Sequence, residues 1–284
     1  MRRFHHAVLV AILGVALVQA IRAQDLVQAP RPDGEQTPLR VYAPSAPGCA
    51  PLALISPGAG GSENGYTYLA EGLRDDGWRA IVMGHKESGR AAPRSDVRQA
   101  GGINKGVREL VADPDAYSAR EMDIKAALDW ASSTCKAPYR ALLGHSMGAR
   151  TVMVEAGAKN KLGVVGLHRF HAYVAISPDG PDSMFPEHAW SEIGKPMLIL
   201  TGTRDKSMAT GSYESRTIPY EDMPPRCKWL GVIDGATHMN FAGIGFAGST
   251  EKLTLLETKA FLDGLRGGKC GAPVQAEGIR VESK

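Results

Sequence analysis

Short, continuous apolar segments alternate with amphipathic helical patterns along most of this chain. Seven segments have the length and composition of strands: 39–42, 52–56, 79–83, 140–143, 172–176, 197–201 and 229–234. Consecutive apolar residues are typical of strands buried on both faces of a parallel sheet. Helical patterns follow over 66–76, 118–132, the residues after 146, and 250–263, and a capping box of Ser118 and Glu121 places one helix start at Ser118. The alternation predicts an α/β domain with right-handed crossover connections.

Composition and charge exclude several classes of protein. The 284 residues are 43% hydrophobic and 22% charged, which argues against a disordered, collagen-like or coiled-coil chain. The net charge of +3 equals the contribution of Arg2, Arg3 and Arg22, so the chain without residues 1–23 carries 3 − 3 = 0. A neutral chain gives no electrostatic reason to bind nucleic acid or an anionic membrane. We therefore expect neither partner.

The N-terminus has the pattern of a secretory signal peptide. Arg2 and Arg3 precede an apolar run over 7–18, and the small residues Ala20 and Ala23 follow it. The run is shorter than the roughly 17–25 residues of a membrane-spanning helix. We expect residues 1–23 to be removed, which leaves a periplasmic or secreted protein without a membrane span.

Three further regions complete the expected organisation. Residues 24–38 form a Pro-rich approach segment, 39–265 the domain, and 266–284 a polar C-terminal tail. Residues 86–117 make a long connection, which is typical of a lid, a binding loop or a solvated excursion. This connection holds six basic residues: Lys86, Arg90, Arg94, Arg98, Lys105 and Arg108.

The strand at 140–143 runs directly into Gly144-His145-Ser146-Met147-Gly148, and a helical pattern follows. This G-x-S-x-G turn between strand and helix is a nucleophile elbow, which holds its serine in a strained conformation with the hydroxyl exposed. Side chains at Gly144 and Gly148 would clash with neighbouring backbone. We expect His145, inside the elbow, to pack against the protein.

A serine hydroxyl needs a base and an orienting acid before it becomes a good nucleophile. Asp205 follows the strand at 197–201, and His238 follows the strand at 229–234. The order Ser, acid, His is the one that accompanies a nucleophile elbow. We predict Ser146, Asp205 and His238 as the catalytic residues. Asp179 and Asp182, which follow the strand at 172–176, remain alternative acids.

The negative charge that develops during attack by the serine needs two backbone N–H donors. Met147 follows the nucleophile and supplies one of them. The loop after the strand at 52–56 reads Pro57-Gly58-Ala59-Gly60-Gly61-Ser62, and we assign the second donor to Ala59. This loop lacks the G-K-[ST] ending of a phosphate-binding loop.

Four motifs together resemble the α/β-hydrolase superfamily: SPGAGGS at 56–62, GHSMG at 144–148, LILTGTRD at 198–205 and DGATH at 234–238. Over residues 39–265 the chain is similar to the secreted bacterial dienelactone-hydrolase-like group, related to platelet-activating-factor acetylhydrolases and polyester hydrolases. The resemblance implies a mostly parallel eight-stranded sheet flanked by helices, and cofactor-free hydrolysis of small carboxylic esters through an acyl-enzyme. Dienelactone hydrolases use a cysteine where Ser146 stands, so their substrate is not implied. Ala59 replaces an aromatic residue frequent in polyester hydrolases, which weakens the case for polymer cleavage.

Four cysteines allow three disulfide pairings, which an exported protein can form. No C-x-x-C motif or His/Cys cluster predicts a metal site. In the sheet order implied by the resemblance, the strands after Cys49 and Cys135 are parallel neighbours, and the last helix returns Cys270 toward Cys227. This order favours the pairs Cys49–Cys135 and Cys227–Cys270.

Three alternatives to an esterase remain open at the level of sequence. The same catalytic residues serve an acyltransferase, which passes the acyl group to an alcohol, or an amidase. A non-catalytic binding module of this fold is the third alternative, although such modules usually lack a catalytic residue, and here all three are present.

Overall fold

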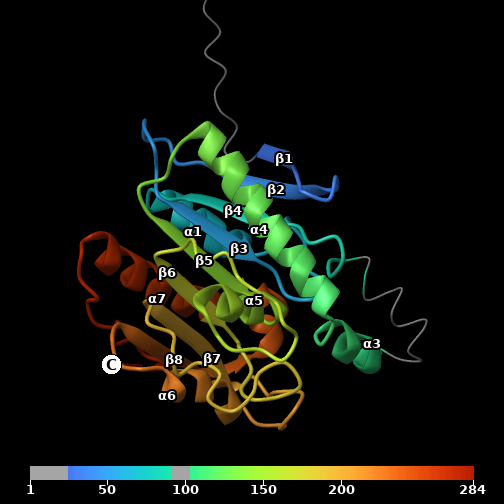
Figure 1. Ribbon diagram of the computed structural model, residues 1–284. Coiled ribbons are helices and arrows are strands. Elements are labelled where there is room, and N and C mark those ends of the chain that lie inside the picture. Colours follow the sequence, from blue (N-terminus) through green and yellow to red (C-terminus); the bar gives the residue numbers. More distant parts are fainter. Residues whose placement is uncertain (1–24, 91, 93–102) are drawn as a thin grey trace, which may run out of the picture.

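The computed structural model describes residues 25–90, 92 and 103–284 (Figure 1). The predicted signal peptide, residues 1–23, lies outside the described residues, as do Arg94 and Arg98 of the basic connection. Within the described ranges, no helix is long and apolar enough to cross a membrane.

A single sheet organises the chain. Its nine described strands follow the order β1-β2-β4-β3-β5-β6-β7-β8-β9. Their bounds are β1 Asp25–Pro30, β2 Gln36–Tyr42, β3 Leu52–Ser56, β4 Arg79–Met83, β5 Arg140–His145, β6 Ala172–Ile176, β7 Met197–Arg204, β8 Lys228–Thr237 and β9 Ile279–Ser283. The six strands from β4 to β8 in this order are parallel, and β1, β2 and β9 join antiparallel at the edges. The predicted mostly parallel α/β sheet is confirmed.

The sheet has nine strands instead of the expected eight, because the seven predicted segments all form strands and residues 25–30 and 279–283 add one strand each. Residues 25–30, expected as part of an approach segment, pair with β2, and residues 279–283, expected as part of a polar tail, pair with β8. Both are edge strands with mostly exposed or half-exposed side chains. Their sequences therefore lack the continuous apolar character by which the buried strands were predicted.

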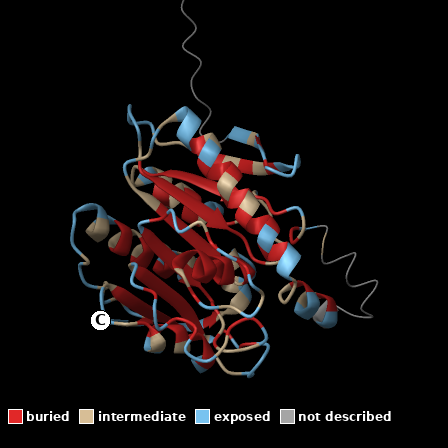
Figure 2. Ribbon diagram, in the orientation of Figure 1, coloured by how far each residue is buried: buried red, intermediate tan, exposed pale blue. Residues whose placement is uncertain are grey.

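Helices cover both faces of the sheet (Figure 1). Their bounds are α1 Thr67–Asp75, α3 Ile103–Leu110, α4 Pro114–Thr134, α5 Met147–Ala156, α6 Ile218–Asp222 and α7 Gly248–Arg266. Helices α4 and α5 bury Ala127 and Val152 in one core, while α1 and α7 bury Leu73 and Phe261 in a second core on the opposite face. Figure 2 shows the central strands β4, β3, β5, β6 and β7 between these layers as almost entirely buried.

Helix α4 begins one turn earlier than predicted. Asp113 is its N-cap residue, with a side-chain oxygen that accepts a hydrogen bond from the Asp115 amide. Ser118 lies inside the helix, where its hydroxyl donates to the Pro114 carbonyl. The Asp113-Pro114 pair is the stronger start signal, since Asp is a preferred N-cap and Pro suits the first helical position.

Two disulfides connect the ends of these elements. Cys49, before β3, bonds to Cys135, which directly follows α4. Cys227, before β8, bonds to Cys270, which lies after α7. These are the pairs that the resemblance favoured.

Candidate active site

Ser146 lies at the sharp turn between β5 and α5. Its backbone has φ 57° and ψ −119°, a conformation that few non-glycine residues adopt. A Cβ atom on Gly144 would lie 2.3 Å from the Gly148 carbonyl oxygen, and one on Gly148 would lie 1.9 Å from the carbonyl oxygen of Ser56. Gly144 is therefore required by the tightness of the elbow itself, and Gly148 by the close approach of the elbow to β3.

The structure brings Ser146, His238 and Asp205 together. The Ser146 hydroxyl lies 2.9 Å from Nε2 of His238, and Nδ1 of His238 lies 3.0 Å from Oδ1 of Asp205. The two side chains come from adjacent strand ends, because Asp205 follows β7 and His238 follows β8. The arrangement allows His238 to accept the serine proton while its second nitrogen donates to Asp205.

Asp205 is held rigidly in the protein interior. Its side chain is fully buried, and Oδ2 accepts a hydrogen bond of 3.0 Å from the Thr201 hydroxyl. The Arg216 guanidinium lies 3.0 Å from Oδ1 and also donates to the Asp205 carbonyl oxygen. A buried carboxylate with these partners is compensated in charge and fixed in orientation toward His238.

The two alternative acids bond to other groups. Asp179 accepts hydrogen bonds from Arg150, Arg216 and the Ser207 hydroxyl. Asp182 pairs with Arg150 and accepts from the amides that follow it. Neither carboxylate contacts His238.

Ser177 is a site residue that the sequence did not single out. Its hydroxyl lies 2.7 Å from Nδ1 of His238, so this nitrogen shares its proton between Ser177 and Asp205. Ser177 is fully buried, has φ 56°, and directly follows β6. Its position at the carboxyl end of a buried strand was the available signal, since ligand-facing residues of α/β sheets collect there.

His145 packs in the interior, as predicted, and connects two loops of the site. Its Nδ1 lies 2.8 Å from the Tyr66 hydroxyl, which accepts from the Gly58 amide, and its Nε2 lies 3.1 Å from the His238 carbonyl oxygen. Burial, followed by the nearby His238 and Arg216, holds the pKa of His145 well below its usual value. A neutral ring therefore donates from Nε2 and accepts at Nδ1.

Residues 57–62, which we call the glycine loop, lie beside Ser146. In the part of the chain that the structure describes, the amides of Ala59 and Met147 donate to no protein acceptor. Met147 is the first residue of α5, so its N–H has no partner within the helix. Both predicted donors are thus available to an external oxygen atom.

A buried polar network centred on Arg120 of α4 holds the glycine loop in place. Arg120 of α4 donates 2.8 Å bonds to the Pro57 carbonyl and the Ser88 hydroxyl, and the Ser88 carbonyl accepts from the Gly60 amide at 2.8 Å. Arg120 also donates to the hydroxyl of Ser56, the last residue of β3. The loop segment that includes Ala59 is therefore fixed at both ends.

Behind Arg120, the hydroxyl of Ser56 lies 2.9 Å from Nε2 of His85, and Nδ1 of His85 lies 2.8 Å from Asp123. Burial lowers the pKa of His85 to about 4, with Arg120 adding to the effect and Asp123 opposing it. His85 is therefore neutral at pH 7. Its Nε2 accepts a hydrogen bond from the Ser56 hydroxyl, and its Nδ1 donates to the Asp123 carboxylate.

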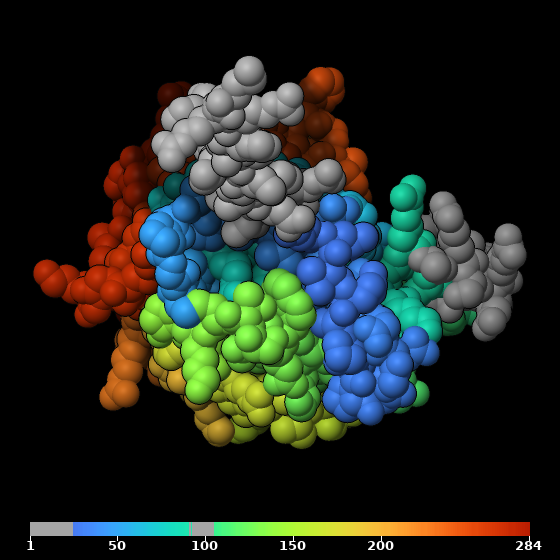
Figure 3. Space-filling model, turned by 90° about the horizontal axis from the view of Figure 1, so that it is seen from above, coloured from blue at the N-terminus to red at the C-terminus, as the bar shows by residue number. Residues whose placement is uncertain are grey.

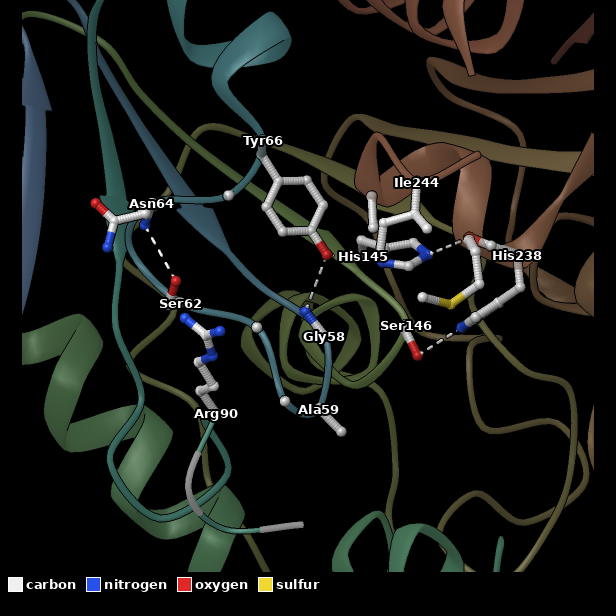
Figure 4. A pocket seen from close by; sticks show the side chains of 15 residues that line it. Gly58, Ala59, Ser62, Asn64, Tyr66, Arg90, His145, Ser146, His238 and Ile244 are labelled. Atoms are coloured by element: carbon white, nitrogen blue, oxygen red, sulfur yellow. Dashed lines mark hydrogen bonds between the residues drawn. The ribbon is translucent and has the colours of Figure 1, made fainter. Parts of the chain in front are cut away.

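A cavity of ≈ 330 Å³ opens in front of Ser146 (Figure 4). Met239, Ala242 and Ile244 form an apolar part of its wall, while Asn64 and Arg90 give it a polar part. In Figure 4, Ile244 lies on one side of Gly58 and Ala59, and Asn64 and Arg90 lie on the other. Among the described residues, no group of three or more His, Cys, Asp or Glu side chains could hold a metal ion.

Comparison of this chain with known proteins identifies its fold. No protein-family model matches the chain, and no curated protein matches it. An alpha-beta serine hydrolase homologue from Coxiella burnetii is similar at 18% identity and a TM-score of 0.56, over 82% of this chain and 96% of that one. Est1E from Butyrivibrio proteoclasticus matches at 16% and 0.56 over 81% and 96%, and a Pyrococcus furiosus esterase at 16% and 0.55 over 81% and 90%. The chain thus has the α/β-hydrolase fold, in common with these serine hydrolases and esterases.

Proposed function

We propose that this chain is an exported serine hydrolase that cleaves carboxylic esters through an acyl-enzyme on Ser146. The observation that carries the proposal is the continuous series of contacts from Ser146 through His238 to Asp205. Ser146, at one end of this series, faces a cavity and lies beside two unpaired amides. The signal-peptide pattern and the two disulfides support an oxidising location outside the cytoplasm. The resemblance to the dienelactone-hydrolase-like group supports the same reaction class.

In the proposed mechanism, His238 removes the proton of Ser146 while the hydroxyl oxygen attacks the ester carbonyl. Asp205 orients the imidazole and stabilises its cation, and the Ser177 hydroxyl shares the Nδ1 proton. The amides of Ala59 and Met147 bind the oxyanion. His238 protonates the departing alcohol, then activates a water molecule that releases the acid and regenerates Ser146.

The first test is hydrolysis of p-nitrophenyl esters with acyl chains of two, four, eight and twelve carbons, by the wild type and by Ser146→Ala. The ≈ 330 Å³ cavity favours short chains, so we expect the highest kcat/KM at two or four carbons. Loss of turnover in Ser146→Ala supports the serine esterase. A folded wild type that cleaves none of the esters would contradict it.

Acyl transfer is measured in the same assay by adding methanol or glycerol. Hydrolysis predicts free acid as the main product, whereas an acyltransferase gives mainly the new ester. Amide analogues of the best ester test for amidase activity.

A further inference from the structure

The edge of the sheet opposite Ser146 carries a second, basic cavity. Leu52, Arg79 and Arg140 are the first residues of β3, β4 and β5, and Leu52 pairs in register with both arginines. In-register neighbours of a parallel sheet point to the same face, and their strands lie about 5 Å apart. The two arginines therefore flank Leu52 on the face that α4 covers.

This basic cavity has a volume of ≈ 300 Å³. It is lined by Leu52, Arg79, Ala131, Ser132, Cys135, Lys136, Ala137 and Arg140. Three of these side chains are cationic and none of them is acidic. Figure 3 shows the corresponding end of the molecule, where the end of α4 (green) lies beside the segment before β3 (light blue), to which Cys135 is bonded through Cys49.

Two buried donors at this cavity lack acceptors. Arg79 is 7% exposed, and its terminal nitrogen donates to the carbonyl oxygens of Ala131 and Cys135 at 2.9 and 3.0 Å. Its Nε, and also Nε of Arg140, are buried and have no hydrogen-bond partner in the described part of the chain. Unpaired buried donors are rare in native proteins and call for an explanation, of which a bound water or ion is one.

The charge at this edge is also uncompensated. Burial lowers the pKa of Arg79, and no carboxylate acts against this effect. The buried guanidinium groups of Arg31 and Arg150, in contrast, each lie against carboxylates. Burying a cation without a counter-charge is costly, so a ligand that supplies negative charge would stabilise this edge.

We infer that the basic cavity binds a small tetrahedral oxyanion, namely a phosphate or sulfate group. The guanidinium groups of Arg79 and Arg140 would turn so that Nε–H of each, buried in this structure, reaches the anion, and the flexible Lys136 would approach it from the exposed side. Guanidinium groups suit this role because their N–H donors match the oxygen spacing of such anions. The anion would tie three strands to the end of α4, remote from the proposed catalytic site.

The test is isothermal titration calorimetry of the purified protein with inorganic phosphate, in a chloride buffer of constant ionic strength. We expect saturable binding at one site per chain. Sulfate and glycerol phosphate are titrated in parallel. Equal affinities indicate a free oxyanion as the natural ligand, whereas tighter binding of glycerol phosphate indicates a phosphorylated small molecule.

Variants locate the site. Arg140→Gln should weaken binding about tenfold to hundredfold, because it removes a charge-assisted hydrogen bond. The exposed Lys136 gives a second variant, Lys136→Gln, which should weaken binding several-fold without affecting the fold. Arg280→Gln, an exposed arginine on β9, is the matched control and should bind like the wild type.

Phosphate bound at the proposed catalytic site must be distinguished from phosphate in the basic cavity. Ser146→Ala and Arg90→Gln change the proposed catalytic site and leave the basic cavity intact, so both variants should bind phosphate with wild-type affinity. No saturable binding by the wild type would overturn the inference. So would unchanged binding by both Arg140→Gln and Lys136→Gln, or loss of binding in Arg90→Gln.

Discussion

Two Ser–His–Asp arrays lie on either side of the glycine loop, and their hydrogen-bond distances are nearly the same. In the outer array, Ser146, His238 and Asp205 are joined by contacts of 2.9 and 3.0 Å. In the inner array, Ser56, His85 and Asp123 are joined by contacts of 2.9 and 2.8 Å. A search for this hydrogen-bond pattern alone would find both arrays equally.

The arrays differ in access and in surroundings. Ser146 is held in a strained turn at the wall of a cavity, next to two unpaired amides. Ser56 is fully buried at the end of a regular strand, and Arg120 donates to its hydroxyl oxygen. The oxygen that would attack a substrate is therefore already occupied in the inner array.

The comparison indicates that a nucleophile requires an exposed oxygen and a place for the developing negative charge, in addition to a histidine and an acid. The Ser56 oxygen of the inner array is buried and already bonded to Arg120, and the contacts of this array instead hold the glycine loop through Arg120 and Ser88. We interpret the inner array as the support of the oxyanion donor at Ala59. The predictions below test this division of roles.

The largest expected difference is between the two serines. Ser146→Ala should reduce kcat on a p-nitrophenyl ester about a million-fold, because it removes the proposed nucleophile. Ser56→Ala should keep kcat within about tenfold and lower the free energy of unfolding by about 1–3 kcal/mol, since two buried partners lose a hydrogen bond. Steady-state kinetics and urea unfolding of both variants measure the contrast. A million-fold loss in folded Ser56→Ala would reverse the assignment.

Substitution of Asp205 should affect mainly activity, whereas substitution of Asp123 should affect mainly stability. Asp205→Asn is expected to lower kcat about ten-thousand-fold, because an amide no longer holds His238 in the required tautomer. Asp123→Asn should mainly destabilise the protein, since Asp123 accepts from His85, Thr37 and Arg31 in the interior. Asp179→Asn is the matched control. If Asp205→Asn kept near-normal kcat, the acid would have to be reassigned to Asp179 or Asp182.

Arg120 should affect the reaction through the glycine loop. Arg120→Met removes the bonds to Pro57 and Ser88, so Ala59 loses its fixed position and kcat should fall about tenfold to hundredfold with little change in KM. Arg120→Lys, which keeps the charge, should recover part of the loss. Lys125→Gln on the exposed side of α4 is the control. A change confined to stability, with kcat unaltered in the folded variants, would remove the link to the glycine loop.

The outer array was more predictable from sequence than the inner one. Ser146, Asp205 and His238 each come three or four residues after a predicted strand, so their residue types and positions indicated a common edge of the sheet. Asp179 remained an alternative to the preferred Asp205, because the pairing of Asp179 with Arg150 depends on packing between distant segments. The edge strands β1 and β9 were missed for a related reason, since backbone pairing at a sheet edge needs no apolar pattern.

The inner array has no comparable sequence signal. Ser56, His85 and Arg120 come from β3, the connection after β4 and the middle of α4, and only the fold brings them together. His85 follows Gly84 in a connection rich in polar residues, where a histidine is unremarkable. Buried polar networks of this kind depend on three-dimensional packing, and this dependence is why the proposed role in positioning the loop rests on the structure.

The smallest expected effect concerns Glu121, the neighbour of Arg120 on α4. Burial, followed by the neighbouring Glu155 carboxyl, raises the pKa of Glu121 well above its usual value, while Arg120 opposes the shift. Glu155 itself accepts hydrogen bonds from the amides of Leu167 and His168. Unlike the carboxylates of the two arrays, Glu121 is buried without a bonded cation among the described residues.

The sign of the pH effect follows from this raised pKa. Below about pH 4, the ordinary pKa of an unfolded glutamate, both the folded and the unfolded chain carry the proton, and Glu121 costs no stability. As the pH rises from there through the folded pKa, folding requires proton uptake and becomes less favourable. Glu121→Gln removes this dependence. The melting temperature of the variant minus that of the wild type should therefore become larger as the pH is raised from 5 to 8. Glu109→Gln, on the exposed helix α3, is the control for loss of a carboxylate. A constant difference between the two melting temperatures across this range would show that Glu121 is ionised in the folded protein, with Arg120 as its effective counter-charge.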